Sequence, residues 1–331
     1  MTRTGGDVWA GRPCLVTGAA GFGGSHLCST LLGLGARVYA LDRVFPRTSF
    51  LTLQGLAARV DFVQGDIRNL DLMRSILERF EIDAVFHLAA QPIAPMSNVI
   101  PLETLSVNAM GTYTVLEAMR TTSCAKHLVF ASSGAYYGTT TTDRPIHEDD
   151  APCAASNIYA PSKVAGDVAV RAYAKVYGIK AAVCRFMNTY GPGDTNFSRI
   201  VPRAIRNLIH GADYDFGDRD DGSTRLDYLY IRDMSNAYIK LAEHLDVATG
   251  EAFNFGRGHS VSTSEMTKLI SRVFDGRERE PLFHGPRREV PVVKYLDIQK
   301  AKRVLDWQPT TTLEQGVAET IDWYRRFLDQ L

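Results

Sequence analysis

Two side chains four residues apart, Tyr159 and Lys163, form the pair in this chain best suited to move a proton. If the segment is helical, this spacing places the phenol and the ammonium on one face. An unperturbed tyrosine has a pKa of about 10, and a nearby cation favours its phenolate, so we expect a base that works near neutral pH. Such a base suits removal of a proton from a hydroxyl group. The alternative is a half-buried tyrosine beside a lysine whose stem covers apolar surface.

A serine pair, Ser132 and Ser133, follows an apolar run that ends the fifth strand we predict. Open parallel sheets bind their ligands beyond the carboxyl ends of the strands. We therefore expect Ser133 to share one site with Tyr159 and Lys163, and we predict these three residues as the catalytic set.

A glycine-rich turn lies between the first predicted strand and the helix after it. Gly18 allows a tight turn, Gly21 allows the backbone to approach a pyrophosphate, and Gly24 allows close packing of helix and strand. The free N–H groups of the helix start favour an anion. The spacing is GxxGxxG with a further glycine at position 23, and in this context it predicts a bound dinucleotide. The alternative is an ordinary glycine-rich loop.

An acidic residue, Asp42, ends the second predicted strand. A carboxylate there can accept both ribose hydroxyls of an adenosine, which favours NAD. The next residue, Arg43, would suit a 2′-phosphate, so NADP stays open. After the third strand, Asp66 and Ile67 would lie beside the adenine, unless Asp66 only caps the helix that follows.

The elements that position these residues alternate in type along the first half of the chain. Apolar, β-branched strands are expected at 13–18, 36–42, 60–66, 83–90, 126–133 and 180–186, with helices at 24–34, 69–80, 102–120 and 159–177. Strands that are apolar on both faces and separated by helices imply a parallel sheet covered on each side. Right-handed crossovers make it doubly wound, so we predict an α/β Rossmann fold.

The character of the chain changes after residue 186. A loop rich in glycine, asparagine and proline is followed by shorter elements, which predicts a smaller α/β substrate-binding domain over 187–331, beside a dinucleotide-binding domain over 1–186. Residues 226–247 again read as strand then helix, and we expect them to return to the first domain. The last helix has one apolar face that must dock on the protein.

Composition excludes several classes of protein and of partner. Hydrophobic residues make up 45% of the chain, and 37 basic residues balance 37 acidic ones, so we expect a globular protein that binds neither nucleic acid nor membrane. No apolar run approaches the ~18 residues of a membrane span, and the start lacks a secretory pattern, which favours the cytoplasm. The five cysteines form no CxxC pair and the histidines no HxxxH or HExxH motif, so no metal site is expected.

Taken together and in order, the motifs resemble those of the extended short-chain dehydrogenases/reductases, in the NAD-dependent sugar-nucleotide epimerase/dehydratase family. The matching pieces are TGAAGFGGSHL, GDIRN, HLAAQ, VNAMGT, SSGAYYG, YAPSK, RFMNTYGPG, DYLYIRD and KAKRVLDWQPTTTLEQG. They cover nearly the whole chain. Within the family, NFSRIVPRAIR and HLAAQP resemble the CDP-glucose 4,6-dehydratase branch most.

The resemblance implies roles for individual residues. It implies that NAD contacts Gly18, Gly21, Phe22, Gly23, Asp42, Arg43, Asp66, Ile67, Leu88, Ala89, Ala90, Gln91, Asn108, Ala131, Tyr159 and Lys163. It implies that a nucleoside-diphosphate sugar contacts Ser97, Ser133, Asn188, Asn196, Phe197, Arg199, Arg225 and Arg287. It further implies a homodimer formed through the helices near 102–120 and 159–177.

Three positions depart from the family pattern. Gly134 and Ala135 stand where the dehydratases carry an acid and often a second charged group, and neither can protonate a leaving hydroxyl. Leu226 stands where the phosphate-binding arginine belongs, with Arg225 one residue early. A slip of one residue reverses the face of a strand, so Arg225 reaches a diphosphate only through a local bulge. Arg287 and its neighbour Arg288 are an alternative phosphate clamp, or a solvated pair.

These observations favour an NAD-dependent epimerase that transiently oxidises C4 of a nucleotide-bound hexose. The first alternative is a 4,6-dehydratase of the CDP-glucose type whose acid is Asp194, Tyr136 or Tyr137. The second is a non-catalytic NAD(P)-binding sensor, which an intact Tyr159 and Lys163 pair argues against.

Overall fold

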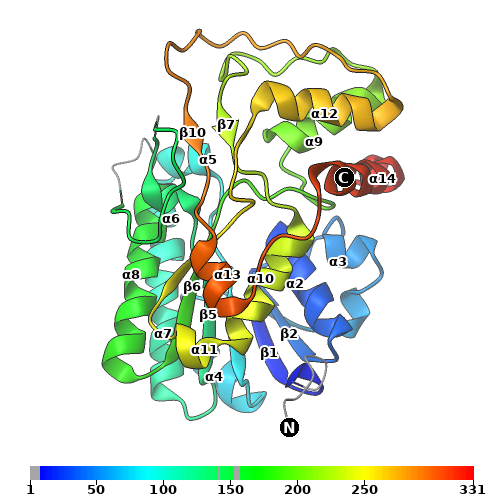
Figure 1. The fold of residues 1–331 in the computed structure, drawn as a ribbon. Coiled ribbons are helices and arrows are strands. Elements are labelled where there is room, and N and C mark those ends of the chain that lie inside the picture. The colour runs from blue at the N-terminus through cyan, green and yellow to red at the C-terminus, as the bar shows by residue number, and fades with distance from the viewer. Residues whose placement is uncertain (1–7, 141, 153–156) are drawn as a thin grey trace.

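The computed structural model describes residues 8–140, 142–152 and 157–331, and its centre is a seven-stranded parallel sheet (Figure 1). The strand order is β3-β2-β1-β4-β5-β6-β8. The strands are β1 (Pro13–Thr17), β2 (Arg37–Asp42), β3 (Asp61–Gln64), β4 (Ala84–His87), β5 (His127–Ala131), β6 (Lys180–Phe186) and β8 (Ala252–Phe255). The predicted doubly wound α/β fold is confirmed.

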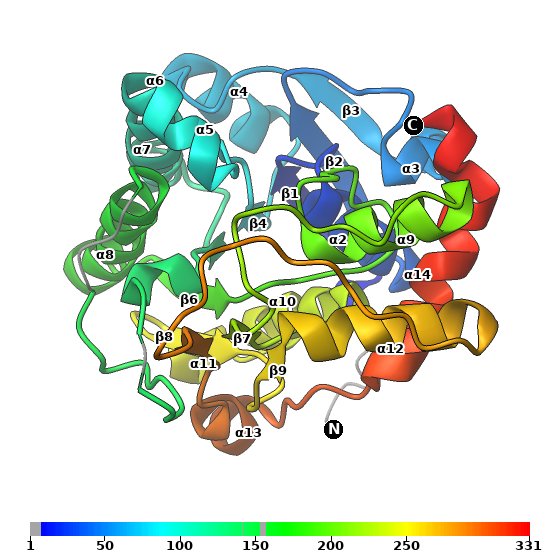
Figure 2. The same ribbon diagram turned by 90° about the horizontal axis from the view of Figure 1, so that it is seen from above.

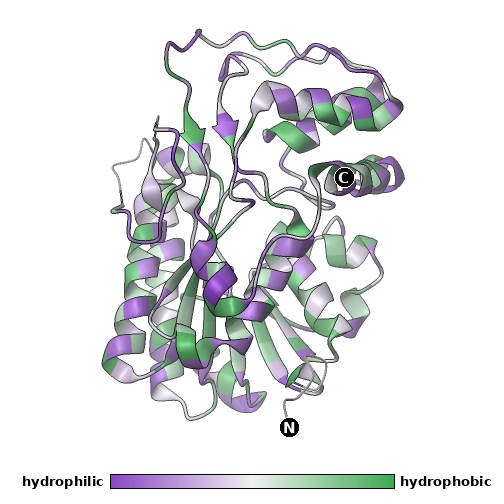
Figure 3. Cartoon of the chain, in the orientation of Figure 1, coloured by the Kyte–Doolittle hydropathy of each residue, from purple (hydrophilic) through white to green (hydrophobic). Residues whose placement is uncertain are grey.

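Helices cover both faces of this sheet (Figure 2). One face carries α4 (Leu70–Arg79), α7 (Gly111–Thr121) and α8 (Tyr159–Tyr177), and the other carries α2 (Phe22–Gly33), α10 (Ile231–Glu243) and α11 (Leu245–Ala248). Successive residues of β1 point to opposite cores: Leu15 packs with the first group of helices, and Cys14 and Val16 with the second. The strands of the large sheet are therefore mostly hydrophobic, as Figure 3 shows.

The predicted helix over 102–120 is three consecutive pieces. It consists of α6 (Pro101–Leu105), a π-helical turn over Ser106–Met110, and α7. A short helix, α5 (Ala94–Val99), precedes it, and α3 (Phe50–Leu53) follows β2. The π-helical turn contains the predicted cofactor residue Asn108, and such turns often occur at functional sites.

A second group of elements lies over the carboxyl ends of the strands (Figures 1 and 2). It contains α9 (Ile200–His210), α12 (Thr263–Asp275), α14 (Leu313–Phe327) and a small mixed sheet, in the order β10 (Val293–Lys294), β7 (Arg225–Leu226), β9 (Val261–Ser262). The apolar face of the last helix packs against α9 and α12. Between the two groups, α13 (Gln299–Leu305) contacts β8.

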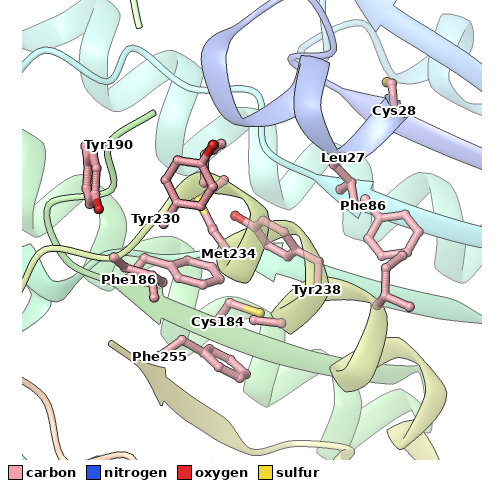
Figure 4. Packing of buried hydrophobic residues seen from close by; sticks show 14 of the residues in the cluster. Leu27, Cys28, Phe86, Cys184, Phe186, Tyr190, Tyr230, Met234, Tyr238 and Phe255 are labelled. Carbon is pink, nitrogen blue, oxygen red and sulfur yellow. The ribbon is translucent and has the colours of Figure 1, made fainter. Parts of the chain in front are cut away.

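Part of the second half of the chain packs on the large sheet or joins it. Helix α10 packs on α2, β5 and β6, and Figure 4 shows its Met234 and Tyr238 beside Phe186 of β6. Strand β8 then adds to the edge of β6 in parallel. The strand that we expected at the start of 226–247 instead belongs to the small sheet, because β7 pairs with β10 and β9. A domain boundary at residue 186 stays a prediction.

Candidate functional site

A single cleft of about 1070 Å³ opens where the carboxyl ends of the parallel strands face the second group of elements. A pocket of this size accommodates a dinucleotide or a ligand of comparable size. Most residues predicted to bind the cofactor line it: Gly18, Gly21, Phe22, Gly23, Asp42, Arg43, Asp66, Ile67, Leu88, Ala89, Ala90, Gln91, Ala131 and Tyr159. The cleft is thus assembled from the loops after β1, β2, β3, β4 and β5.

The glycine turn brings two strand-end loops together. Gly18 has a φ of 70°, and a Cβ built on it would lie 2.8 Å from the backbone of Ala89. A Cβ on Gly24 would overlap the carbonyl oxygen of Gly18. Helix α2 begins after Gly21 with no side chain capping its first N–H groups. The turn is therefore a backbone cradle at a helix N-terminus, and it fits the pyrophosphate of NAD.

The acidic residue after β2 is held in position by the backbone. Asp42 accepts hydrogen bonds from the amides of Ala20 (3.0 Å) and Arg43 (2.8 Å), and it faces the cleft. The guanidinium of Arg43 is largely exposed, 3.9 Å from Glu103. A fixed carboxylate at this place suits free ribose hydroxyls and repels a 2′-phosphate, so the geometry fits NAD.

Asp66 lines the cleft, but its carboxylate is hydrogen-bonded to a nearby arginine. Its carboxylate accepts three hydrogen bonds from the amide and guanidinium of Arg68, which lowers its pKa. The capping role considered for it falls instead to Asn69, whose side chain accepts from the amide of Leu72 at the start of α4.

Tyr159 begins helix α8 and faces the cleft beside Ser133. Burial raises the pKa of Tyr159, while a hydrogen bond with the Ser133 side chain and the charge of Arg199 oppose this rise. The amide of Tyr159 donates to Ser97 Oγ at 2.9 Å. Both side chains therefore line the cleft at the carboxyl ends of the strands, and their catalytic role stays a prediction.

Lys163 lies behind the cleft, outside its lining, and its effect on the pKa of Tyr159 stays a prediction. Its side chain is 3% exposed, with Nζ 4.7 Å from the centre of the Phe130 ring. Burial lowers the pKa of Lys163 to about 8, opposed by the charge of Asp167. The spacing correctly placed phenol and ammonium on one helix.

Asn108, predicted to touch the cofactor, is likewise buried outside the cleft lining. Its side chain accepts from the amide of Gln91 (2.7 Å), and donates to the Gln91 carbonyl (3.1 Å) and to Ser162 Oγ (2.9 Å). Asn108 thus ties the loop after β4 to helix α8. Its contribution is to hold two cleft walls together.

Of the predicted substrate residues, Ser133, Asn188 and Arg199 line the cleft. Asn188 is exposed and has a φ of 38°, a left-handed conformation that asparagine tolerates better than most residues. Arg199 Nη1 lies 3.0 Å from Asp194 Oδ2, and burial raises the pKa of Asp194. This part of the cleft offers one amide and one paired guanidinium to a ligand.

The other predicted substrate residues lie outside the lining. Ser97 is buried, and its hydroxyl is used by Tyr159 and the Ala94 carbonyl. Asn196 accepts from Ser198, and Phe197 packs on the core. Arg287 is exposed and does not reach the cleft.

Because the arginine stands one residue early in β7, its side chain lies on the face of the strand away from the cleft. Leu226 lines the cleft, whereas Arg225 points to the opposite side, where it bonds the Ser260 carbonyl (3.1 Å) and Glu265 (3.3 Å). Arg225 does not line the cleft, and its phosphate contact stays a prediction. Arg288, the alternative clamp, is bound to Asp220 and Thr224.

The segment after Ser133 carries no acid into the cleft. A Cβ on Gly134 would lie 2.6 Å from Met187 Cε and 3.1 Å from the Phe186 carbonyl oxygen. Tyr136 and Tyr137, considered as alternative acids, are buried and do not line the cleft. Asp194 is the one of the three alternatives that does.

Two cleft residues missed by sequence reasoning have polar atoms with no partner. Ser132 Oγ and Tyr228 Oη are buried and make no hydrogen bond within the described parts of the chain, although both residues line the cleft. Buried polar groups are nearly always hydrogen-bonded, so these two are candidates to bond a ligand. Their positions inside SSGAYYG and DYLYIRD were the available signal. In the part of the chain that the structure describes, no group of His, Cys, Asp or Glu forms a metal site.

Comparison with known proteins agrees with this geometry. Residues 14–256 match the model of the NAD dependent epimerase/dehydratase family. The chain is 34% identical over 317 residues to a UDP-glucose 4-epimerase of Mycolicibacterium smegmatis, covering 94% of this chain and 98% of that one.

Solved structures show the same likeness. A Thermotoga maritima UDP-glucose 4-epimerase with UDP-glucose superposes with a TM-score of 0.85 at 28% identity, covering 96% of this chain and 99% of the other. A Streptomyces venezuelae dTDP-glucose 4,6-dehydratase with NAD bound gives 0.84 at 26% identity, covering 96% and 98%. Both an epimerase and a dehydratase therefore share this architecture.

Proposed function

Because this chain belongs to the NAD-dependent epimerase/dehydratase family, we propose that it is a nucleotide-sugar 4-epimerase acting on a nucleoside-diphosphate hexose. Its cofactor is NAD, which the glycine turn and Asp42 would hold. The relatives named UDP-glucose 4-epimerase make UDP-glucose the first substrate to test.

The residues at the cleft mouth supply the acid–base part of this reaction. NAD, when bound, would supply the hydride acceptor for oxidation of the C4 alcohol and, once reduced, the hydride donor for the ketone. Tyr159 Oη accepts the proton of the C4 hydroxyl and gives it back when the ketone is reduced. Ser133 Oγ, which lines the cleft with Tyr159, orients the same hydroxyl. Inversion results when the ketone turns its other face before reduction.

The observation that carries the choice of epimerisation is the packing around Gly134. Loss of water from C5 and C6 requires an acid beside the leaving hydroxyl. Gly134 faces Met187 and the Phe186 carbonyl too closely to accept a side chain without movement. The neighbouring Ala135 has no ionisable group, so neither position can supply that acid.

Incubation with UDP-, CDP-, GDP- and dTDP-hexoses tests the proposal. The expected product is the C4 epimer of one of them, identified by chromatography and NMR. A 4-keto-6-deoxy product, which absorbs in alkali, would refute epimerisation and indicate the dehydratase, with Asp194 as its remaining acid.

Tyr159→Phe separates an enzyme from a sensor. Loss of the phenolic oxygen is expected to lower kcat by about 10²–10⁴-fold, the usual contribution of a general acid–base group, while NAD stays bound. If the wild type has no turnover, and Tyr159→Phe binds NAD as the wild type does, the protein is the sensor.

We also propose a homodimer in the cytoplasm, formed through α7 and α8. Large apolar side chains are exposed along these helices: Tyr113 on α7, Met110 directly before it, and Val168 and Val176 on α8. Within the described residues, no helix combines the length and apolar character needed to cross a bilayer. Light scattering tests the dimer: Val168→Glu should give monomers, whereas Val247→Glu on α11 should not. A wild-type monomer would refute it.

A further inference from the structure

A fully buried ion pair lies behind the cleft, between α8 and β6. Arg185 donates to Asp167 through two parallel hydrogen bonds of 2.9 Å, and neither side chain is exposed. Removing two charges from water is costly, and apolar residues of similar volume often serve stability equally well. Stability alone therefore does not account for the pair.

Asp167 lies on α8, the helix that also carries Tyr159 and Lys163. It lies one turn beyond Lys163 on α8, so both side chains share one face. The Phe130 ring lies over the Lys163 ammonium, and nearby His87 of β4 is kept neutral because burial lowers its pKa to about 3. Asp167 is the anionic group that opposes the effect of burial on Lys163.

Arg185 contacts a different segment next to the site, the 3₁₀ turn over Gly134–Tyr137. Its guanidinium lies 3.7 Å from the centre of the Tyr136 ring and donates to Tyr137 Oη at 2.7 Å. Tyr137 Oη in turn donates to Asn254 Oδ1 of β8 at 2.7 Å. The turn starts directly after Ser133, whose hydroxyl accepts from the Ala135 amide at 3.1 Å.

We propose that Asp167 and Arg185 are positioning residues that clamp the helix carrying Tyr159 and Lys163 to the turn carrying Ser133. The pair sets the hydrogen bond between Ser133 and Tyr159, and Asp167 supplies the negative charge that faces Lys163. This inference rests on the proposed epimerase function. Neither residue lines the cleft, so neither touches substrate.

The test compares Asp167→Asn and Tyr137→Phe with a matched control, Asp83→Asn. Asp83 also pairs with an arginine, Arg12, but at the opposite ends of the strands. Asp167→Asn should lower kcat at least about tenfold with KM within about twofold, since a small misplacement of reacting groups is costly. It should also move the alkaline limb of the kcat profile to lower pH, because Lys163 loses the carboxylate that holds its proton.

Tyr137→Phe keeps the ion pair and removes one hydroxyl, so it is the variant expected to fold if Asp167→Asn does not. It should lower kcat about threefold to tenfold with an unshifted pH limb. Asp83→Asn should lower the Tm and leave kcat and the pH profile unchanged. Full kcat and an unmoved limb in Asp167→Asn, or unchanged kcat in Tyr137→Phe, would overturn the positioning role.

Ionisation of Tyr159 gives a measurement that needs no substrate. The phenolate absorbance that disappears in Tyr159→Phe reports this residue, and in Arg185→Gln it should form at higher pH because the hydrogen bond from Ser133 is weakened. An unmoved titration would refute the clamp. Absence of turnover in the wild type would instead refute the proposed function and leave this measurement valid.

Discussion

Exchanging the side chains at the two positions of β7 tests which face of that strand serves the ligand. Leu226 faces the cleft and Arg225 faces away, toward Ser260 and Glu265. Leu226→Arg places a guanidinium toward the space where we propose the diphosphate binds. Arg225→Leu removes a guanidinium that this structure assigns to the surface.

The magnitude follows from the surroundings of each side chain. A hydrogen bond from a charged group contributes about 1.5–3 kcal/mol, and ordering an arginine side chain costs up to about 2 kcal/mol. Two such bonds contribute about 3–6 kcal/mol, so about 1–4 kcal/mol remains after the ordering cost, and a tenfold gain in affinity, about 1.4 kcal/mol, lies at the lower end of this range. Arg225 and Glu265 are 36% and 57% exposed, so Arg225→Leu should change stability by less than about 1 kcal/mol and affinity very little.

Calorimetric titration of UDP into the NAD-loaded protein provides the assay. Leu226→Arg should bind UDP about tenfold more tightly at low salt, and the gain should shrink as salt screens the new charge. Arg225→Leu should bind as the wild type does. The opposite pattern, a tenfold loss in Arg225→Leu with no gain in Leu226→Arg, would refute the assignment of faces.

Three further predictions concern the cofactor end of the cleft and the buried lysine. Because burial lowers the pKa of Lys163 to about 8, its ammonium is lost as pH rises through that value, and we expect kcat to fall above about pH 8 in a pH–rate series. A flat profile across this range would contradict the assignment. Gly24→Ala forces a Cβ into the carbonyl of Gly18 and should destabilise the fold by about 1–3 kcal/mol in thermal unfolding, with NAD lost from the purified protein. Asp42→Ala should lower the affinity for NAD by about tenfold and reduce the ratio of NAD affinity to NADP affinity, as measured by fluorescence titration. An unchanged ratio would argue against the ribose contact.

Much of the fold could be predicted because the signals that encode it are local. Apolar runs without alternation indicated strands buried on both faces, and strands β1 to β6 lie within the expected ranges. The glycine turn was equally readable, since φ of 70° at Gly18 and the crowding at Gly24 admit no other residue without strain. The extent of the large sheet was less readable, because β8 joins it from a distant part of the chain.

The candidate site was predicted by residue type better than by position. Spacing placed Tyr159 and Lys163 on one helix, but spacing carries no information on how a long side chain is directed once other elements surround it. The ring of Phe130 and the charge of Asp167 place the lysine behind the cleft. Asn108 and Ser97 were also predicted to contact a ligand. They lie beside the cleft without lining it, and their hydrogen bonds to α8 hold its walls together.

The sequence by itself determined the class of fold and the glycine turn, and it indicated the residues proposed for proton transfer, because each depends on neighbours within a few residues. Only the tertiary structure decided that Leu226 lines the cleft and Arg225 does not, and that Asp167 of α8 pairs with Arg185 of β6. Those outcomes depend on which strands and helices pack together, and residues far apart along the chain set them.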